Sequence, residues 1–320
     1  MNQKLKLVFY GTSEFAAKTL TALIKKSEFS VSLVVTQPDR VAGRGNKVQT
    51  SPVKEIAIAN NLNLLQPENI KKNKSAFLDQ LHSFGPFDVG VLVVYGQIIP
   101  LDVLEFPSAG TVNIHPSLLP RWRGAAPIRR AILAGDRETG VCLMKMEAGL
   151  DSGPVYTTEK TEIKENESAG ELSERLCLIG IELLLKNLPA ITSGQLKPTK
   201  QEDQGITYAE KIQKQDARIN WDQEASKVIL HIRAMNPEPG AFSFINKKRI
   251  KIFNAQLVDT SNHEHKSGSI VKLSENKLEV ACQKGIISLS EVQLEGKRKN
   301  SITEFLKGIK LREDFEFGDF

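Results

Sequence analysis

The stretch Leu5-Lys6-Leu7-Val8-Phe9-Tyr10, followed directly by Gly11-Thr12-Ser13, decides the fold class of this 320-residue chain. Its apolar run has the length of a buried strand. The glycine can end that strand, and Thr12 or Ser13 can cap a helix whose apolar spacing continues to Ile24. A strand, a short turn and a helix in this order begin a βαβ unit, which predicts a parallel sheet.

Other apolar runs repeat this pattern along the first half of the chain. Strand candidates at residues 31–36, 89–94 and 111–114 are separated by segments with helical spacing. We therefore expect a Rossmann-like α/β domain with a parallel sheet over residues 1–190. A helical pattern over residues 168–188 closes this domain, and Pro189 is expected to stop the helix because proline lacks the backbone N–H.

A second domain is expected after a polar linker at residues 191–207, which is rich in turn residues. The domain itself is expected to span residues 208–320, beginning with a helical pattern around residues 221–234. Short strand candidates follow at residues 241–245, 250–255, 268–273, 278–282 and 286–292. Short strands at close spacing, with turn signals between them, predict a small β-barrel.

Composition excludes several classes of protein. The 43 basic and 38 acidic side chains leave a modest excess that does not by itself indicate a polyanionic partner. Cys142, Cys177 and Cys282 are far apart and form no Cys-x-x-Cys pair, so neither a disulfide framework nor a metal site is expected. No signal region or membrane span is apparent. We expect a cytoplasmic protein, and nothing demands more than a monomer.

The segment Asn113-Ile114-His115-Pro116-Ser117-Leu118-Leu119-Pro120 carries the clearest chemical signal. A lone histidine is more often structural than catalytic. In an extended strand, however, Asn113 and His115 project from the same face and can converge on one oxygen. An amide and an imidazole held in this way can donate hydrogen bonds to the oxyanion of a tetrahedral intermediate.

Asp151 lies in the loop Gly149-Leu150-Asp151-Ser152-Gly153. Alone, it would be read as a turn aspartate that bonds its own backbone. Next to His115 it would fix the tautomer of the imidazole, raise its basicity and take up a proton through a water. A site with an amide, an imidazole and a carboxylate but no nucleophile suits transfer of an acyl carbon to an amine that the substrate brings.

Basic residues gather in a loop after the second strand and on turns of the predicted barrel. Arg40, Arg44 and Lys47 lie in the glycine-containing loop, which is either a solvated loop or an arm that closes over a phosphate-bearing substrate. The turns carry Lys247-Lys248-Arg249 and Lys297-Arg298-Lys299, which are either solubilising charges or contacts to a nucleic-acid backbone.

Several of these motifs together resemble the folate-dependent formyltransferases. The shared stretches are the segment that contains Asn113 and His115, the Asp151 loop, and the early turn Phe9-Tyr10-Gly11-Thr12. Within that superfamily the chain looks like the methionyl-tRNA formyltransferase family. This second resemblance rests on Thr36-Gln37-Pro38-Asp39-Arg40, on Gly43-Arg44-Gly45 and on Arg123-Gly124-Ala125-Ala126-Pro127, as well as on the length of the C-terminal domain.

The resemblance implies transfer of the formyl group of 10-formyltetrahydrofolate to the α-amino group of methionyl initiator tRNA, for translation initiation, without a metal. It implies an OB-like C-terminal barrel and catalytic roles for Asn113, His115 and Asp151. The residues that it assigns to folate binding are Ser117, Leu118, Leu119, Pro120, Gln97 and Ile98. The residues that it assigns to tRNA binding are Arg40, Arg44, Lys47, Lys247, Lys248 and Arg249.

Two other hypotheses remain open. One is a related folate-dependent formyltransferase or formyl hydrolase that acts on a small amine. The other is a non-catalytic RNA-binding protein in which the first domain is only a scaffold.

Overall fold

The computed structural model describes residues 4–42 and 47–318, and at positions 41, 42 and 47 it describes only the backbone. The chain divides into two compact units that alternate along the sequence. The first unit comprises residues 1–124, 139–161 and 173–208, and the second comprises residues 125–138, 162–172 and 209–320. The pattern of the sequence did not indicate that two short segments within residues 1–190 belong to the second unit.

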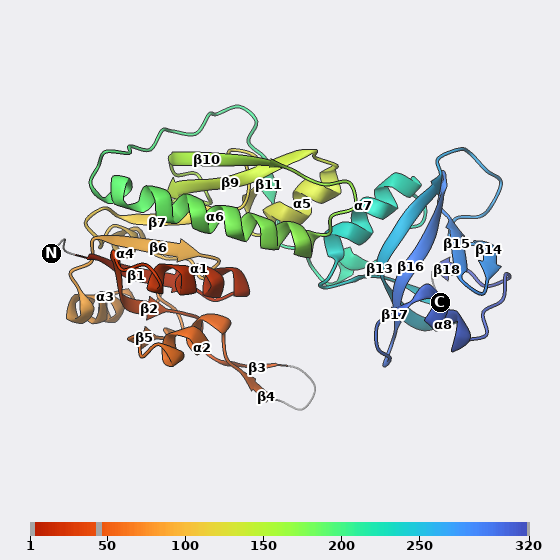
Figure 1. Ribbon diagram of the computed structural model, residues 1–320, viewed down its shortest axis with the longest axis horizontal. Helices are drawn as coiled ribbons and strands as arrows, with labels where there is room; N and C mark the ends of the chain where they lie inside the picture. Colours follow the sequence, from red (N-terminus) through yellow and green to blue (C-terminus); the bar gives the residue numbers. More distant parts are fainter. Residues whose placement is uncertain (1–3, 43–46, 319–320) are drawn as a thin grey trace. The chain divides into compact units, whose positions relative to one another are not determined.

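A mixed sheet forms the centre of the first unit (Figure 1). Its strands, in spatial order, are β10 (Val155–Glu162), β9 (Glu138–Lys145), β7 (Thr111–His115), β6 (Val89–Val93), β1 (Leu5–Gly11), β2 (Phe29–Val35) and β5 (Leu64–Leu65). The pairs from β7 to β5 are parallel, and β9 is antiparallel to β7. The predicted parallel α/β domain is therefore confirmed, with an antiparallel extension at one edge.

Helices cover both faces of this sheet. They are α1 (Glu14–Ile24), α2 (Pro52–Ala59), α3 (Lys74–Phe84), the short α4 (Leu101–Leu104) and α6 (Ala169–Thr192). Ser13 caps α1 as expected, since its side chain accepts a hydrogen bond from the Ala16 amide. Across the described residues, no helix is long and apolar enough to cross a membrane.

Glycine allows α6 to lie directly on the sheet. A Cβ atom at Gly180 would lie 2.7 Å from the Ile114 side chain on β7, and its next neighbours would be Val141 and Phe15. The Cys177 thiol, also on α6, donates to the backbone carbonyl of Phe15 at the start of α1. Both helices therefore pack on the same face of the sheet, as Figure 1 shows, and support the strand that carries Asn113 and His115.

The prediction that Pro189 stops the long helix is wrong, because α6 continues through it to Thr192. Proline removes one backbone donor, but the last turn is held by other contacts. The Thr192 hydroxyl donates to the Leu188 carbonyl, and the Ser193 amide donates to the Pro189 carbonyl. Ile191 is buried in the same turn, so tertiary packing outweighs the local penalty.

The basic loop after β2 is paired at its base. β3 (Arg40–Ala42) and β4 (Lys47–Gln49) form a short antiparallel ribbon in which Arg40 lies opposite Gln49. Farther along the chain, the short strand β8 (Arg123–Gly124) pairs with β11 (Tyr208–Ala209). The Arg123 amide also donates to the carbonyl of Thr207, the last residue of the predicted linker.

The second unit is built on an antiparallel sheet. Its strands, in spatial order, are β14 (Ile270–Ser274), β15 (Lys277–Ala281), β16 (Ile286–Leu294), β13 (Lys248–Asp259), β12 (Ala241–Ile245) and β18 (Phe317–Gly318), with β17 (Asn300–Ser301) on β16. Its helices are α5 (Pro127–Ala134), η1 (Gln215–Ala217), α7 (Ala225–Met235) and α8 (Ile302–Lys307). Asn246 and Lys247 both have positive φ, as a two-residue hairpin turn between β12 and β13 requires.

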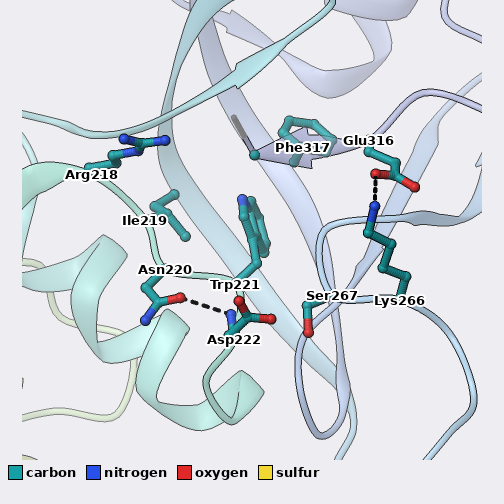
Figure 2. A pocket seen from close by; sticks show the side chains of 10 residues that line it. Arg218, Ile219, Asn220, Trp221, Asp222, Lys266, Ser267, Glu316 and Phe317 are labelled. Carbon is teal, nitrogen blue, oxygen red and sulfur yellow. Dashed lines mark hydrogen bonds and ion pairs between the residues drawn. The ribbon is translucent and has the colours of Figure 1, made fainter. Parts of the chain in front are cut away.

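The two ends of this sheet meet, which confirms the predicted barrel-like domain. Ser269, just before β14, forms an antiparallel bridge with Glu316, just before β18. The Phe317 amide donates to the Gly268 carbonyl at 2.7 Å. Lys266 pairs with Glu316 beside this junction, and the ring of Trp221 lies next to Phe317 (Figure 2). The barrel is thereby closed by backbone contacts and buried rings.

Candidate active site

Strand β7 places Asn113 and His115 in the interior of the first unit. They are 6% and 4% exposed, and β7 is flanked by β6 and β9. Among the residues that the structure describes, none forms a hydrogen bond with the Asn113 side chain. Buried amides are nearly always hydrogen-bonded, so this side chain is suited to a bound substrate.

His115 has a defined tautomer. Its Nε2 lies 3.0 Å from the carbonyl oxygen of Trp122, which can only accept, so Nε2 carries a proton. Its Nδ1 lies 3.7 Å from Oδ2 of Asp151, which is longer than a hydrogen bond. In the neutral imidazole, an unprotonated nitrogen therefore faces a carboxylate.

Burial lowers the pKa of His115, while the Asp151 charge and the hydrogen bond to Trp122 oppose this decrease. Asp151 acts in the expected direction, because its negative charge raises the pKa of the imidazole. Removal of the ring from water is the larger effect, so the pKa is lowered overall. His115 is thus kept neutral at rest, with Asp151 favouring any proton that arrives at Nδ1.

Asp151 is held firmly in its loop. Its Oδ2 accepts a hydrogen bond from the Gly124 amide at 2.7 Å, and its backbone has a positive φ of 49°. A non-glycine residue in this region is strained, and such strain persists where surrounding contacts maintain it. These contacts fix the direction in which the carboxylate points.

Gln201 is the residue of this site that sequence analysis missed. Its Nε2 donates to the carbonyl oxygens of Asp151 and Gly153, both at 2.7 Å, while its Oε1 accepts two hydrogen bonds from the Arg123 guanidinium. Both side chains are buried. The local sequence around Gln201 is polar and irregular, so no pattern there indicated a role in a site fifty residues upstream.

The turn after His115 is shaped by buried contacts. The Ser117 side chain is buried, and its hydroxyl donates to the Arg121 carbonyl at 2.7 Å. Leu118 packs so closely on β9 that a Cβ atom at Gly140 would lie 2.5 Å from it. Leu119 and Pro120 are half-buried and are joined by a cis peptide bond. Ser117 therefore stabilises the turn through its side chain and its backbone, since its amide donates to the His115 carbonyl and its carbonyl accepts from the Cys142 thiol.

Large apolar side chains are exposed in two segments of the first unit, one of which contains the predicted folate-binding residue Ile98. Val94 and Ile98 follow β6, Leu150 precedes Asp151, and they are 50%, 75% and 60% exposed. The amide of Gln97 is engaged elsewhere, since it bonds the backbone of Ile70 and Pro67. Exposed apolar groups of this kind often mark a surface that a ligand covers.

A cavity of about 580 Å³ opens at the carboxyl ends of β1, β2 and β6. Its lining includes Thr12, Gln37, Arg40 and Tyr95. Asn113 lies on the adjacent strand, opposite Leu92 of β6, so the cavity begins one strand away from its amide. In open α/β sheets ligands bind at this edge, and the volume suits a small-molecule ligand.

The predicted basic residues are distributed over both units. Arg40 is exposed at the start of β3 and lines this cavity. Arg44 lies outside the described residues, and only the backbone of Lys47 is described. In the second unit, Lys247 and Lys248 are exposed on the β12–β13 turn, and the half-buried Arg249 lies 3.8 Å from the centre of the Phe242 ring. No group of three or more potential metal ligands is found among the described residues.

Comparisons with known proteins agree with both halves of the chain. Residues 4–188 match the family "Formyl transferase", and residues 211–310 match "Formyl transferase, C-terminal domain". Methionyl-tRNA formyltransferase of Dictyoglomus turgidum is 41% identical over 309 residues, which are 96% of this chain and 97% of that protein. The protein of the same name from Methylococcus capsulatus is 44% identical, over 96% of this chain and 98% of its own length.

Solved structures show the same fold. WlaRD, a sugar 3N-formyltransferase, superposes with a TM-score of 0.67 at 20% identity, over 93% of this chain and all of its own. HypX from Aquifex aeolicus in complex with tetrahydrofolic acid has a TM-score of 0.61 at 18% identity, over 98% of this chain and 51% of its own. At these identities the likeness concerns the fold alone.

Proposed function

Because the chain belongs to the methionyl-tRNA formyltransferase family, we propose that it transfers the formyl group of 10-formyltetrahydrofolate to the α-amino group of methionyl initiator tRNA. The product is N-formylmethionyl-tRNA for translation initiation. The observation that carries the proposal is the buried Asn113 amide, which lacks a hydrogen-bond partner in the described chain and shares its strand with the His115–Asp151 pair.

The residues present fit a folate co-substrate. Val94, Ile98 and Leu150 offer apolar surface to a pterin ring, and the Asn113 amide offers a donor to the formyl oxygen. Because the Gln97 side-chain amide is bound within the protein, its proposed part in folate binding falls to its backbone groups. Ser117 is fully buried and bonded internally, so we propose that it supports the folate-binding turn from within. Leu118, Leu119 and Pro120 are proposed to shape the turn against which the folate packs.

The first catalytic task is to stabilise charge on the formyl oxygen as the amine adds to the formyl carbon. The Asn113 amide donates to this oxygen from a site that excludes most water, where such a hydrogen bond is strong. Nε2 of His115 is already bound to Trp122. Donation by His115 therefore requires a proton on Nδ1, where the Asp151 carboxylate stabilises the resulting charge.

The second task is to move one proton. A free α-amino group has a pKa of about 7.7 to 8.0, so a useful fraction is neutral near physiological pH. As the new C–N bond forms, the amine loses a proton, which Asp151 accepts directly or through a water. The same proton then reaches the folate nitrogen as the bond from that nitrogen to the formyl carbon breaks. Gly124, Gln201 and Arg123 maintain the position of Asp151 during this transfer.

The proposed acceptor is tRNA rather than a small amine. Arg40 stands on the β3–β4 ribbon and lines the cavity beside Asn113, as a contact to the acceptor end would require. Lys247, Lys248 and Arg249 provide basic groups on the second unit. We place the catalytic domain at residues 1–190, the linker at 191–207 and the tRNA-binding domain at 208–320.

One experiment separates the three hypotheses. The full-length protein is incubated with 10-formyltetrahydrofolate and either methionyl initiator tRNA or small amines such as an amino sugar nucleotide. Formylation of the tRNA supports the proposal. Transfer only to small amines would reject tRNA as the substrate. Binding of tRNA without transfer to any amine would support the hypothesis of a non-catalytic RNA-binding protein.

A further inference from the structure

A second, smaller cavity lies wholly within the second unit. It has a volume of about 270 Å³ and is formed by the end of β16, the turn that follows it, and α8. Its floor is apolar and consists of Val292, Leu294, Phe305 and Ile309. This volume is below the roughly 300–1,000 Å³ of pockets for drug-sized ligands, so it suits a single heterocycle.

Asn300 adds an unsatisfied polar group to this apolar floor. Its backbone pairs with Val292 in the β16–β17 ladder, and the residue is part of the cavity lining. The Oδ1 atom is buried and has no hydrogen-bond partner among the described residues. Such an acceptor lowers stability unless a ligand supplies an N–H group. An asparagine amide presents a donor and an acceptor side by side, as the edge of a nucleobase does.

The rim of the cavity is basic. Lys297 and Arg298 are exposed there, and neither forms an ion pair within the described residues. One carboxylate, Glu304, also lines the cavity. The neighbouring Lys299 is occupied, because it pairs with Glu291 and lies over the Phe253 ring. Two available cations against one carboxylate favour an anionic group beside the bound ring.

We propose that this cavity binds one unpaired nucleobase of the RNA substrate. The base lies on the apolar floor with its edge against Asn300, and the adjoining phosphates contact Lys297 and Arg298. A small inorganic anion would leave the apolar floor uncovered, and an apolar ligand would leave the cations and Asn300 unused. The inference rests on the proposed function, since it takes tRNA as the substrate, and it names one place where the folded tRNA is held.

Gly308 allows the cavity to be filled without disturbing the fold. It lines the cavity and has an ordinary φ of −95°, and a Cβ atom there would meet nothing nearer than 3.6 Å. A Gly308→Leu variant should occupy the space of the base, while Gly308→Ala adds one methyl group and leaves most of the cavity open. Arg298→Gln removes a rim cation, and Lys307→Gln is its matched control, because Lys307 is exposed but does not line the cavity.

The readouts are kcat and KM for methionyl initiator tRNA, tRNA affinity across a salt series, and the unfolding temperature. In Gly308→Leu we expect KM to rise roughly tenfold, because one base contact is lost. The value of kcat and the slope of log K against log salt should not change. Arg298→Gln should weaken binding and reduce the slope of log K against log salt by about one. Gly308→Ala should raise KM less than Gly308→Leu does, and Lys307→Gln should resemble the wild type.

A direct measurement covers the case in which Gly308→Leu does not fold. In the isotope-labelled wild-type chain, addition of an unacylated initiator tRNA transcript should shift the side-chain amide signals of Asn300. The proposal is overturned if these signals do not move, or if Gly308→Leu and Arg298→Gln, both folded, bind tRNA as tightly as the wild type. Either result leaves the proposed function intact, because formylation by the wild-type protein tests that function separately.

Discussion

Nδ1 of His115 and Oδ2 of Asp151 face each other at 3.7 Å, while the opposite ring nitrogen is bound to the backbone of Trp122. The gap is too long for a hydrogen bond in the resting state. A shorter distance between Nδ1 and Oδ2 becomes favourable only when Nδ1 gains a proton, because the imidazolium is then attracted to the carboxylate. In the proposed mechanism, the pair would stabilise a charge that develops during the reaction.

Replacing Asp151 should change the titration of His115 in a defined direction. Asp151 raises the pKa of His115 against the larger effect of burial, so Asp151→Asn should lower that pKa further. Asparagine can still accept from the Gly124 amide, which keeps the loop in place. Histidine NMR titration of both proteins measures the shift, and His231, buried in the second unit, is the internal control. An unchanged or raised pKa of His115 would contradict the proposed coupling.

Asn113→Ala should reduce kcat by on the order of a hundredfold or more, the usual loss for one oxyanion donor. Its stability should be close to that of the wild type, because no described residue bonds the amide that is removed. Single-turnover formylation and thermal unfolding measure the two quantities. Asn113→Asp is the matched control, since it keeps the shape but replaces the donor with a charge that repels the oxyanion. Near-full activity in either variant would sink the assignment.

Gln201→Leu should impair both stability and catalysis, although residue 201 lies outside the predicted catalytic domain. The substitution leaves the buried Arg123 guanidinium without its acceptor and releases the Asp151 and Gly153 carbonyls. Unsatisfied buried groups of this kind cost about 1–3 kcal/mol. Chemical denaturation and kcat are the measurements. Gln201→Glu retains an acceptor for Arg123 but cannot donate to Asp151, so a loss of kcat there with normal stability would isolate the positioning role.

Gly268→Ala should destabilise the barrel strongly. A Cβ atom at this position would lie 2.1 Å from the Phe317 carbonyl oxygen, and φ is 84°. The clash separates the strands that close the barrel, so we expect a loss well above the roughly 1 kcal/mol of backbone strain alone. Gly194→Ala isolates the strain, because its φ is 72° but nothing lies within 4 Å of the added atom. Equal denaturant midpoints for the two variants would contradict the claim that the contact between Gly268 and Phe317 closes the barrel.

Much of this architecture can be derived from local patterns. The run at residues 5–10 and the Ser13 cap predicted the first βα unit, which the structure contains as β1 and α1. The period of two in a strand predicts that Asn113 and His115 lie on one face. The prediction that Pro189 ends the helix was wrong, because the burial of Ile191 and the contacts of the last turn keep α6 helical beyond it.

Local patterns, then, determined the order of the elements, the α/β class, the barrel-like second domain and the side chains that one strand presents. They did so because strand and helix periodicity are properties of neighbouring residues. Only the folded chain decided the tautomer of His115, the anchoring of Asp151 by Gln201 and the closure of the barrel at Gly268. Each of these depends on a backbone atom or a distant side chain that folding brings close. No periodic pattern in the sequence predicts such a contact.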